Sequence, residues 1–241
     1  MKRALVLNSG GVDSTTCVSI AVKELGAENV STVSVYYGQK PNKELDAAKN
    51  VASHYGINRY EIDLSKAGIF DKSNCPLLAG REEAIKHESY AEQIEKNGEG
   101  MVSTYVPFRN GLMLSSVAAL AMSLFPNDEV DVYLGAHADD AAGNAYADCS
   151  EEFTKAISEA ITNGTYGKVC LKAPLVNLNK AEVVSLGLGL GAPYDLTWSC
   201  SEGGEFPCGE CGTCIDRAEA FAKNGVQDPA LEKVRGITHG V

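Results

Sequence analysis

The segment Ser9-Gly10-Gly11-Val12-Asp13-Ser14 follows a short apolar run at residues 3–8 and opens a helix-forming stretch at residues 13–25. A glycine-rich turn between a buried strand and a helix aims backbone N–H groups at an anion, and the helix dipole favours negative charge there. The two glycines let a phosphate approach the backbone closely. The segment lacks the Gly-Lys-Ser ending of a Walker A loop and the spacing of a dinucleotide fingerprint. It predicts a phosphate site beside the first strand of an α/β domain.

A carboxylate inside a phosphate site needs its own explanation. Asp13 either caps the helix or binds Mg2+, and both roles are physically reasonable. Hydroxyl groups on Ser9, Ser14 and Thr15 can add donors to the ligand. The alternative is a plain strand–turn–helix without a ligand. We expect the binding loop to comprise eight consecutive residues, of which Asp13 and Ser14 are also candidate catalytic groups: Asn8, Ser9, Gly10, Gly11, Val12, Asp13, Ser14 and Thr15.

Strand and helix patterns alternate along the chain as far as residue 190. This alternation predicts a doubly wound α/β fold with a mainly parallel, five-stranded sheet. We expect the main domain to cover residues 1–191. A charged stretch at residues 71–100 interrupts the pattern, with a short polar helix expected at 82–96; it is either a solvated insertion or a lid over a site. The expected strands are 3–8, 30–37, 60–64, 130–135 and 168–173, and the expected helices are 13–25, 42–56, 111–125, 151–163 and 179–190.

Composition excludes several classes of protein. The chain has 241 residues, of which 44% are hydrophobic, so a disordered or low-complexity protein is excluded. Its formal net charge of -11 argues against a general nucleic-acid binder, which would need clustered Lys and Arg. No apolar run approaches the ~20 residues that span a bilayer, and the apolar run near the start stops at Asn8. We therefore expect a cytoplasmic protein without membrane or direct nucleic-acid partners, whose anion site is a local positive pocket.

Four cysteines near the C-terminus follow the pattern C-x7-C-x2-C-x2-C: Cys200, Cys208, Cys211 and Cys214. Paired C-x2-C turns supply thiolates to a tetrahedral zinc ion, and four ligands close its shell, so we predict one structural Zn2+ per chain. An iron–sulfur cluster, a redox dithiol and unrelated buried thiols are the alternatives. We place a small zinc-binding module at residues 192–241, with a helix from about residue 214 to 223.

The loop resembles the signature of the PP-loop, or N-type ATP pyrophosphatase, family. Together with further strings it resembles the family of 7-cyano-7-deazaguanine synthases over almost the whole chain. One departure is Ala147, where that family usually has Pro. The strings that carry the resemblance are Gly38-Gln39, Val106-Pro107-Phe108-Arg109-Asn110, Gly135-Ala136-His137-Ala138-Asp139-Asp140, Tyr146-Ala147-Asp148-Cys149, Thr197-Trp198-Ser199-Cys200, and Cys208-Gly209-Glu210-Cys211-Gly212-Thr213-Cys214 with Arg217.

This resemblance implies an ATP-dependent ligase of queuosine biosynthesis. Such an enzyme adenylates 7-carboxy-7-deazaguanine, lets ammonia displace AMP to give an amide, and activates the amide oxygen with a second ATP so that elimination yields the nitrile. The sheet and the cysteine module use up the 241 residues, which leaves no room for a glutaminase domain. Ammonia is therefore expected to be free or delivered by a partner. The resemblance and the apolar stretch at residues 112–124 also make a homodimer plausible.

Several residues outside the loop are candidates for the site. By resemblance, the backbone around Val35 pairs with the adenine edge. Arg109 can clamp a carboxylate or the α-phosphate, or it is a surface arginine; Asn110 either caps a helix or reads the heterocycle. Lys180 opens a helix and can stabilise phosphate charge in the transition state, or it is a solvated lysine. We count Arg109 and Lys180 as catalytic candidates.

The region after the fourth expected strand supplies the remaining substrate candidates. Ligands of parallel sheets bind at the carboxyl ends of strands, which places Asp139 and Asp140 to hold Mg2+ or to recognise a guanine-like edge. His137 and Asp148 are further candidate substrate contacts, although a loop residue of either type often has no such role.

Three rival functions remain open. Another ammonia-dependent PP-loop ligase, such as NAD synthetase, would match in size and loop but does not call for four cysteines. A tRNA-thiolating enzyme would need reactive cysteines and a basic face, against which the net charge argues. A nucleotide-binding zinc protein without turnover belongs to a different class, and an assay of AMP release would separate it.

Overall fold

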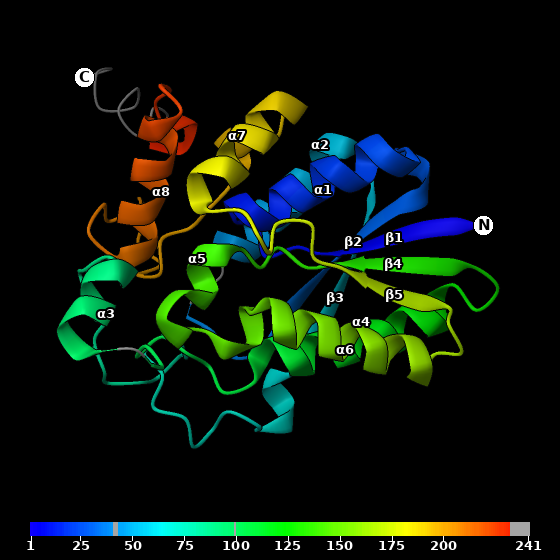
Figure 1. Ribbon diagram of the computed structural model, residues 1–241, viewed down its shortest axis with the longest axis horizontal. Coiled ribbons are helices and arrows are strands. Elements are labelled where there is room, and N and C mark those ends of the chain that lie inside the picture. Colours follow the sequence, from blue (N-terminus) through cyan, green and yellow to red (C-terminus); the bar gives the residue numbers. More distant parts are fainter. Residues whose placement is uncertain (41–42, 99, 232–241) are drawn as a thin grey trace.

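Five parallel strands form one sheet in the order β3-β2-β1-β4-β5. The computed structural model describes residues 1–40, 43–98 and 100–231. The N-terminal strand β1 lies at the centre, and the chain runs outward from it in both directions, which confirms the predicted doubly wound sheet (Figure 1). The strands are β1 (Lys2–Leu7), β2 (Val30–Tyr36), β3 (Asn58–Asp63), β4 (Glu129–Tyr133) and β5 (Val169–Lys172).

Helices cover both faces of the sheet (Figure 1). One face is covered by α1 (Val12–Leu25), α2 (Lys43–Tyr55) and α7 (Lys180–Leu190), and α8 (Gly212–Lys223) lies beside α7 (Figure 1). The other face is covered by α4 (Arg109–Leu124) and α6 (Glu151–Gly164). Shorter elements are α3 (Tyr90–Asn97), α5 (Ala138–Ala141) and 3-10 turns at Ala27–Asn29, Ser65–Ala67, Ala142–Asn144, Ala147–Cys149 and Tyr194–Leu196.

The central strand shows why the sequence forms a doubly covered sheet. Side chains of successive strand residues point to opposite faces. Ala4 and Val6 belong to the core beneath α1 and α7, whereas Leu5 and Leu7 belong to the core beneath α4. All four residues are buried, because both faces are covered, and an unbroken apolar run is the pattern that such a strand requires.

Two local differences from the sequence prediction have physical reasons. The helix expected at 82–96 is shorter and begins at Tyr90, because the Ser89 hydroxyl accepts from the backbone N–H of Glu92 while the Glu92 carboxylate accepts from that of Ser89. The four-residue α5 was not predicted, because a single turn has no measurable periodicity. The expected start of the second helix at Asn42 lies outside the described residues.

The C-terminal helix α8 packs on α7 and contributes to the main core. Phe221 packs edge to face on Tyr194, with ring centroids 5.4 Å apart, and both side chains are buried. Arg217 on the same helix is buried and forms an ion pair of 2.6 Å with Asp228. The division between residues 191 and 192 stays a prediction, and residues 232–241 of the predicted module lie outside the described part of the chain.

In the described ranges, no helix combines the length and the apolar character that crossing a membrane would require.

Candidate active site

The glycine-rich loop leaves the end of β1 and enters α1, as the sequence predicts. The side-chain oxygen of Asn8 accepts from the backbone N–H of Gly10 at 2.9 Å and from the hydroxyl of Ser14 at 3.1 Å. Gly10 has a φ of +84°, and a Cβ there would lie 2.3 Å from the backbone oxygen of Glu44. Gly11 is the last residue before the helix. Asn8 therefore fixes the loop, and its glycines permit the close approach of α2.

A cavity of about 1040 Å³ opens at the carboxyl edge of the sheet. Its wall includes the ends of β1, β2 and β4, which is where ligands of parallel sheets bind. Most predicted site residues line this cavity: Asn8, Ser9, Gly11, Asp13, Ser14, Val35, Arg109, Asn110, His137, Asp139, Asp140 and Lys180. Among the residues predicted for catalysis or for nucleotide or substrate binding, four do not form part of its wall: Gly10, Val12, Thr15 and Asp148.

Asp13 lies at the centre of a charged cluster beside the loop. Lys180 donates to both of its carboxylate oxygens, at 2.7 and 2.6 Å. The His137 Nε2 atom lies 3.4 Å from the Lys180 ammonium and 3.4 Å from a carboxylate oxygen of Asp140. The backbone N–H of Lys180 donates to Asp139 at 2.7 Å. The first turns of α1, α5 and α7 thus bring five predicted residues together.

The charges in this cluster depend on one another. Burial alone would raise the pKa of Asp13, but Lys180 and His137 outweigh burial and hold the pKa below its usual range. Burial raises the pKa of Asp140, although His137 opposes that rise. Asp13 therefore stays ionised and holds the Lys180 ammonium beside the glycine-rich loop. Lys180 is thus the ion-pair partner of the Asp13 carboxylate.

Arg109 lies on the opposite wall, at the first residue of α4. Its guanidinium lies over the ring of Tyr37, 5.6 Å from the ring centroid, and donates to the Tyr37 hydroxyl at 3.3 Å. The carboxylate of Asp148 accepts from the backbone N–H of Asn110 at 2.8 Å, in the first turn of α4. The Asn110 side chain in turn donates to the backbone oxygen of Asp148. Asp148 therefore positions the start of α4, while Arg109 faces the cavity.

Sequence reasoning missed several residues of the cavity wall. Tyr37 and Gln39 follow β2, and Glu44 lies in the first turn of α2. Leu77 and Ile94 of the 71–100 stretch also line the cavity, so this stretch covers part of the site. Glu44 carried no functional signal in the sequence, because a single acidic residue at a helix start is common. Its place at the site depends on the packing of α2 against the glycine-rich loop.

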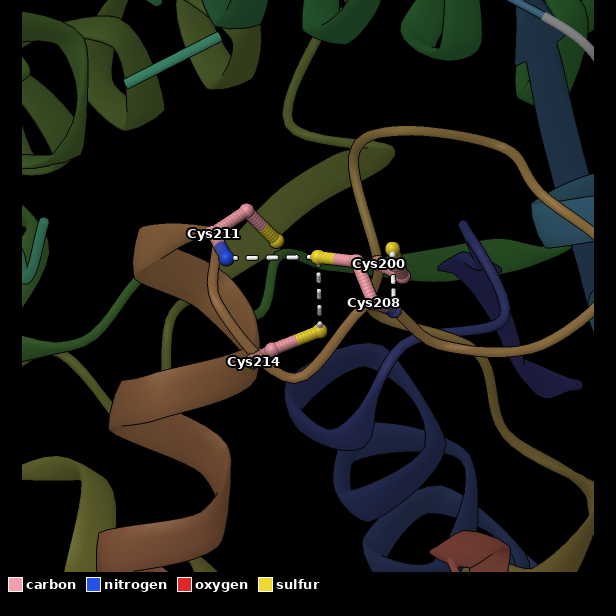
Figure 2. A group of neighbouring side chains, drawn as sticks. All are labelled: Cys200, Cys208, Cys211 and Cys214. Atoms are coloured by element: carbon pink, nitrogen blue, oxygen red, sulfur yellow. Dashed lines mark hydrogen bonds between the residues drawn. The ribbon is translucent and has the colours of Figure 1, made fainter. Parts of the chain in front are cut away.

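The four cysteines converge, as their spacing predicts (Figure 2). Their sulfur atoms all lie within 4.8 Å of one another. A tetrahedral Zn2+ with Zn–S bonds of ~2.3 Å requires sulfurs ~3.8 Å apart, so small side-chain movements would bring them to the metal. Backbone N–H groups of Cys208 and Cys211 donate to neighbouring sulfurs at 3.3 and 3.2 Å. These contacts suit thiolates, and the donor set fits a four-sulfur zinc site.

The cysteine cluster adjoins the glycine-rich loop. Trp198 lies two residues before Cys200, and its backbone N–H donates to the backbone oxygen of Gly10 at 2.9 Å. Its indole N–H donates to the backbone oxygen of Cys200 at 2.8 Å, and the Lys43 ammonium lies 4.9 Å from its ring centroid. Trp198 also lines the cavity. The segment that enters the cluster is therefore part of the wall of the site.

The parallel sheet, the glycine-rich loop at its carboxyl edge and the adjoining four-cysteine cluster define a class of protein: a doubly wound α/β protein with a cavity beside the loop and a four-cysteine site next to it. Within that class, the chain belongs to the family described as queuosine biosynthesis protein QueC, whose model matches residues 3–225. The family expected from the sequence strings is confirmed.

Two relatives with 39% and 40% sequence identity agree with this assignment. A 7-cyano-7-deazaguanine synthase of Archaeoglobus fulgidus is 39% identical over 230 residues, which cover 95% of this chain and 90% of the relative. A 7-cyano-7-deazaguanine synthase of Caldicellulosiruptor saccharolyticus is 40% identical over 227 residues, covering 94% of each chain. The solved structure of an NMN synthetase from Francisella tularensis is similar with a TM-score of 0.47 and 16% identity, covering 97% of this chain and 81% of that one.

Proposed function

We propose that this chain is an ATP-dependent ligase that converts 7-carboxy-7-deazaguanine and ammonia to 7-cyano-7-deazaguanine in queuosine biosynthesis. Membership of the family over residues 3–225 supports the reaction. The observation that carries the mechanism is a single cavity of about 1040 Å³ that joins the phosphate loop, Lys180 and Arg109. A cavity of that size has room for a nucleotide and a bicyclic base together.

The residues of the loop and its neighbours would divide the work. The free N–H groups at the start of α1 bind the phosphates, and the backbone at Val35 faces the adenine. Lys180, held by Asp13, neutralises charge that develops on the phosphates in the transition state. Arg109 binds the carboxylate of the substrate on the opposite wall, where its planar guanidinium suits a carboxylate. The two cationic groups would thus hold the reacting partners from two sides.

Two metal ions complete the proposal. Asp13, Asp139 and Asp140 present carboxylate oxygens beside the loop, and carboxylate oxygen is the donor type that Mg2+ prefers. Mg2+ would neutralise phosphate charge when it is bound.

One Zn2+ bound by the four cysteines would be structural, because four thiolates leave no open position. Elemental analysis of the purified protein should find one zinc per chain, and a brown, iron-containing protein would contradict the assignment.

The proposed reaction is tested by mass spectrometry of a defined mixture. AMP, pyrophosphate and the nitrile should form only when 7-carboxy-7-deazaguanine and ammonium are both present with ATP. Formation of ADP, or a carboxylate that remains unchanged, would contradict the proposal. A parallel mixture with nicotinic acid adenine dinucleotide tests the rival NAD synthetase, and no AMP is expected from it. Absence of AMP with either acid would favour a binding protein without turnover.

A further inference from the structure

Glu44 lines the same cavity as Arg109. It lies in the first turn of α2, its side chain is partly buried, and Tyr37, Gln39 and Leu77 line the cavity around it. The charge of Arg109 acts on Glu44, and the charge of Glu44 acts on Tyr37, so the three side chains are electrostatic neighbours. Glu44 therefore lies within electrostatic reach of Arg109, in the cavity where Arg109 would hold the reacting carboxylate.

Glu44 differs from the carboxylates beside the loop. Asp13 pairs with Lys180, Asp140 contacts His137, and Asp139 accepts from a backbone N–H. For the Glu44 carboxylate, no hydrogen bond or ion pair occurs within residues 1–40, 43–98 and 100–231. No ion pair within these residues therefore holds the Glu44 carboxylate, which is available to accept a proton.

The environment of Glu44 suits proton transfer near neutral pH. Burial raises the pKa of Glu44 to about 7, and the positive charge of Arg109 opposes part of that rise. A general base is most effective when its pKa lies near the working pH. The other titratable or charged groups of the cavity are Tyr37 and Lys40 after β2, Asp13, His137, Asp139, Asp140 and Lys180 beside the loop, Arg109, Tyr146 and Cys149 around the start of α4, Glu95 of α3, Cys200 of the cysteine cluster, and Asp216, Glu219 and Lys223 of α8. Burial also raises the pKa of Tyr37, so its hydroxyl keeps its proton at neutral pH and leaves Glu44 as the acceptor beside it.

The proposed reaction requires a proton acceptor next to nitrogen. When ammonia attacks the adenylated carboxylate, the C–N bond forms, the carbonyl electrons move to oxygen, and they return as the C–O bond to AMP breaks. The attacking nitrogen must then release one proton to give the neutral amide. In the second cycle the activated amide loses its two N–H protons, and their bonding electrons form the additional C–N bonds of the nitrile as AMP leaves.

We infer that Glu44 is the general base that accepts these protons from nitrogen. The inference rests on the proposed function, because it assigns a residue to the ammonia-dependent half of that reaction. The carboxylate accepts one N–H proton at each step and passes it to solvent through the open cavity before the next.

The decisive experiment separates adenylation from nitrogen transfer. Glu44→Gln keeps the size of the side chain but cannot accept a proton. Carboxylate-dependent exchange of labelled pyrophosphate into ATP, measured without ammonium, reports adenylation and should stay within about 3-fold of the unaltered protein. AMP release and amide formation at saturating ammonium should fall by about 100-fold or more. The increase of the amide-forming rate with pH near pH 7 should disappear as well.

Two further variants serve as controls for this test. Asp46→Asn removes a negative charge from the same turn of α2, where the side chain is exposed, and should leave both rates unchanged. Glu44→Asp keeps a carboxylate and should retain part of the ammonia-dependent rate. An equal loss of exchange and amide formation in Glu44→Gln, or no loss of either, would overturn the inference. A lack of nitrile formation by the unaltered protein would instead refute the proposed function.

Discussion

Gly10 is the residue on which the geometry of the loop depends most directly. Its φ of +84° is disfavoured for other residues, and a Cβ would lie 2.3 Å from the backbone oxygen of Glu44 and 2.6 Å from the backbone nitrogen of Ala48. Backbone atoms of α2 cannot turn aside as a flexible side chain could. A side chain at this position must therefore push the loop away from the helix.

We expect Gly10→Ala to lower the free energy of unfolding by about 2–5 kcal/mol, which combines left-handed strain with overpacking. ATP affinity should fall as well, because the loop moves. Calorimetric titration and urea unfolding measure the two effects. Gly56→Ala is the control, since Gly56 has a φ of +64° with nothing within 4 Å of the added Cβ, and it should cost only about 1–2 kcal/mol. Equal costs for the two variants would contradict the steric explanation.

Glu44 also gives a stability prediction that is independent of catalysis. The folded protein holds the Glu44 proton up to a pKa of about 7, whereas the unfolded chain releases it near the ordinary value of 4.5. Because the folded state binds more protons between these values, stability falls as pH rises from 4.5 to 7 and then levels off. The difference corresponds to about 3 kcal/mol.

Glu44→Gln should remove this loss of stability with rising pH. The variant should match the unaltered protein in urea unfolding at pH 4 and exceed it by up to about 3 kcal/mol at pH 8. Asp46→Asn on the same turn serves as the control for a simple change of charge. A Glu44→Gln variant that is less stable at pH 8 than the unaltered protein would show that ionised Glu44 stabilises the fold.

Side chains of helix α8 take part in two ion pairs, one buried and one exposed. The two pairs test how burial changes the contribution of an ion pair to stability. Arg217 donates to both carboxylate oxygens of Asp228, at 2.6 and 2.8 Å, and also reaches the hydroxyls of Thr197 and Ser199. Lys223 lies 3.8 Å from Glu219 with both side chains largely exposed. The buried pair fixes the segment that leads to Trp198 and the cysteines.

We expect Asp228→Ala to lower the free energy of unfolding by about 3–5 kcal/mol, since it leaves the buried guanidinium without its carboxylate. Glu219→Ala on the exposed pair should cost less than about 1 kcal/mol. Chemical unfolding followed by circular dichroism compares the two. Equal effects would mean that Arg217 finds compensating partners or water.

The elements that the sequence predicted well are those with a strong local pattern. The apolar run of β1, the glycine-rich turn and the cysteine spacing each carry their own signal, and the structure places all three as expected. The start of α3 was misjudged because the charged residues before Ser89 have good helix propensity but lie outside the capping box. Glu44 and Tyr37 could not be assigned, because their role depends on which distant elements meet at the cavity.

At the scale of the whole molecule, the proposed function places an anionic nucleotide in an acidic protein. The net charge is -11, and acidic residues outnumber Lys and Arg in the cavity wall itself, so the positive charge beside the glycine-rich loop is local to groups such as Lys180 and Arg109. The net charge argues against an extended basic face for a nucleic acid. The homodimer stays a prediction, which sedimentation equilibrium of the purified protein would test.

The cysteine cluster connects parts of the chain that are far apart in sequence. Ile85 and Leu77 of the 71–100 stretch pack against Cys200, Cys211 and Cys214 in one small apolar cluster. His87 from the same stretch contacts Glu202 at 3.0 Å and Glu210 at 3.2 Å. Since Leu77 also lines the cavity, the cluster supports both the cover and the wall of the site.

Removal of the proposed zinc ion should therefore loosen more than the cysteine loop. After treatment with a chelator, we expect faster hydrogen exchange at residues 200–214 and at residues 77–87, because zinc binding supplies the free energy that orders such loops. Strands β1 and β4 should keep their protection, since both are buried in cores that do not include the four cysteines of the cluster. Cys170→Ser is the control, because Cys170 lies outside the cluster and its loss should leave the zinc content unchanged. If residues 77–87 keep their protection while residues 200–214 lose theirs, the 71–100 stretch is held in place by the main domain rather than by the cysteine cluster.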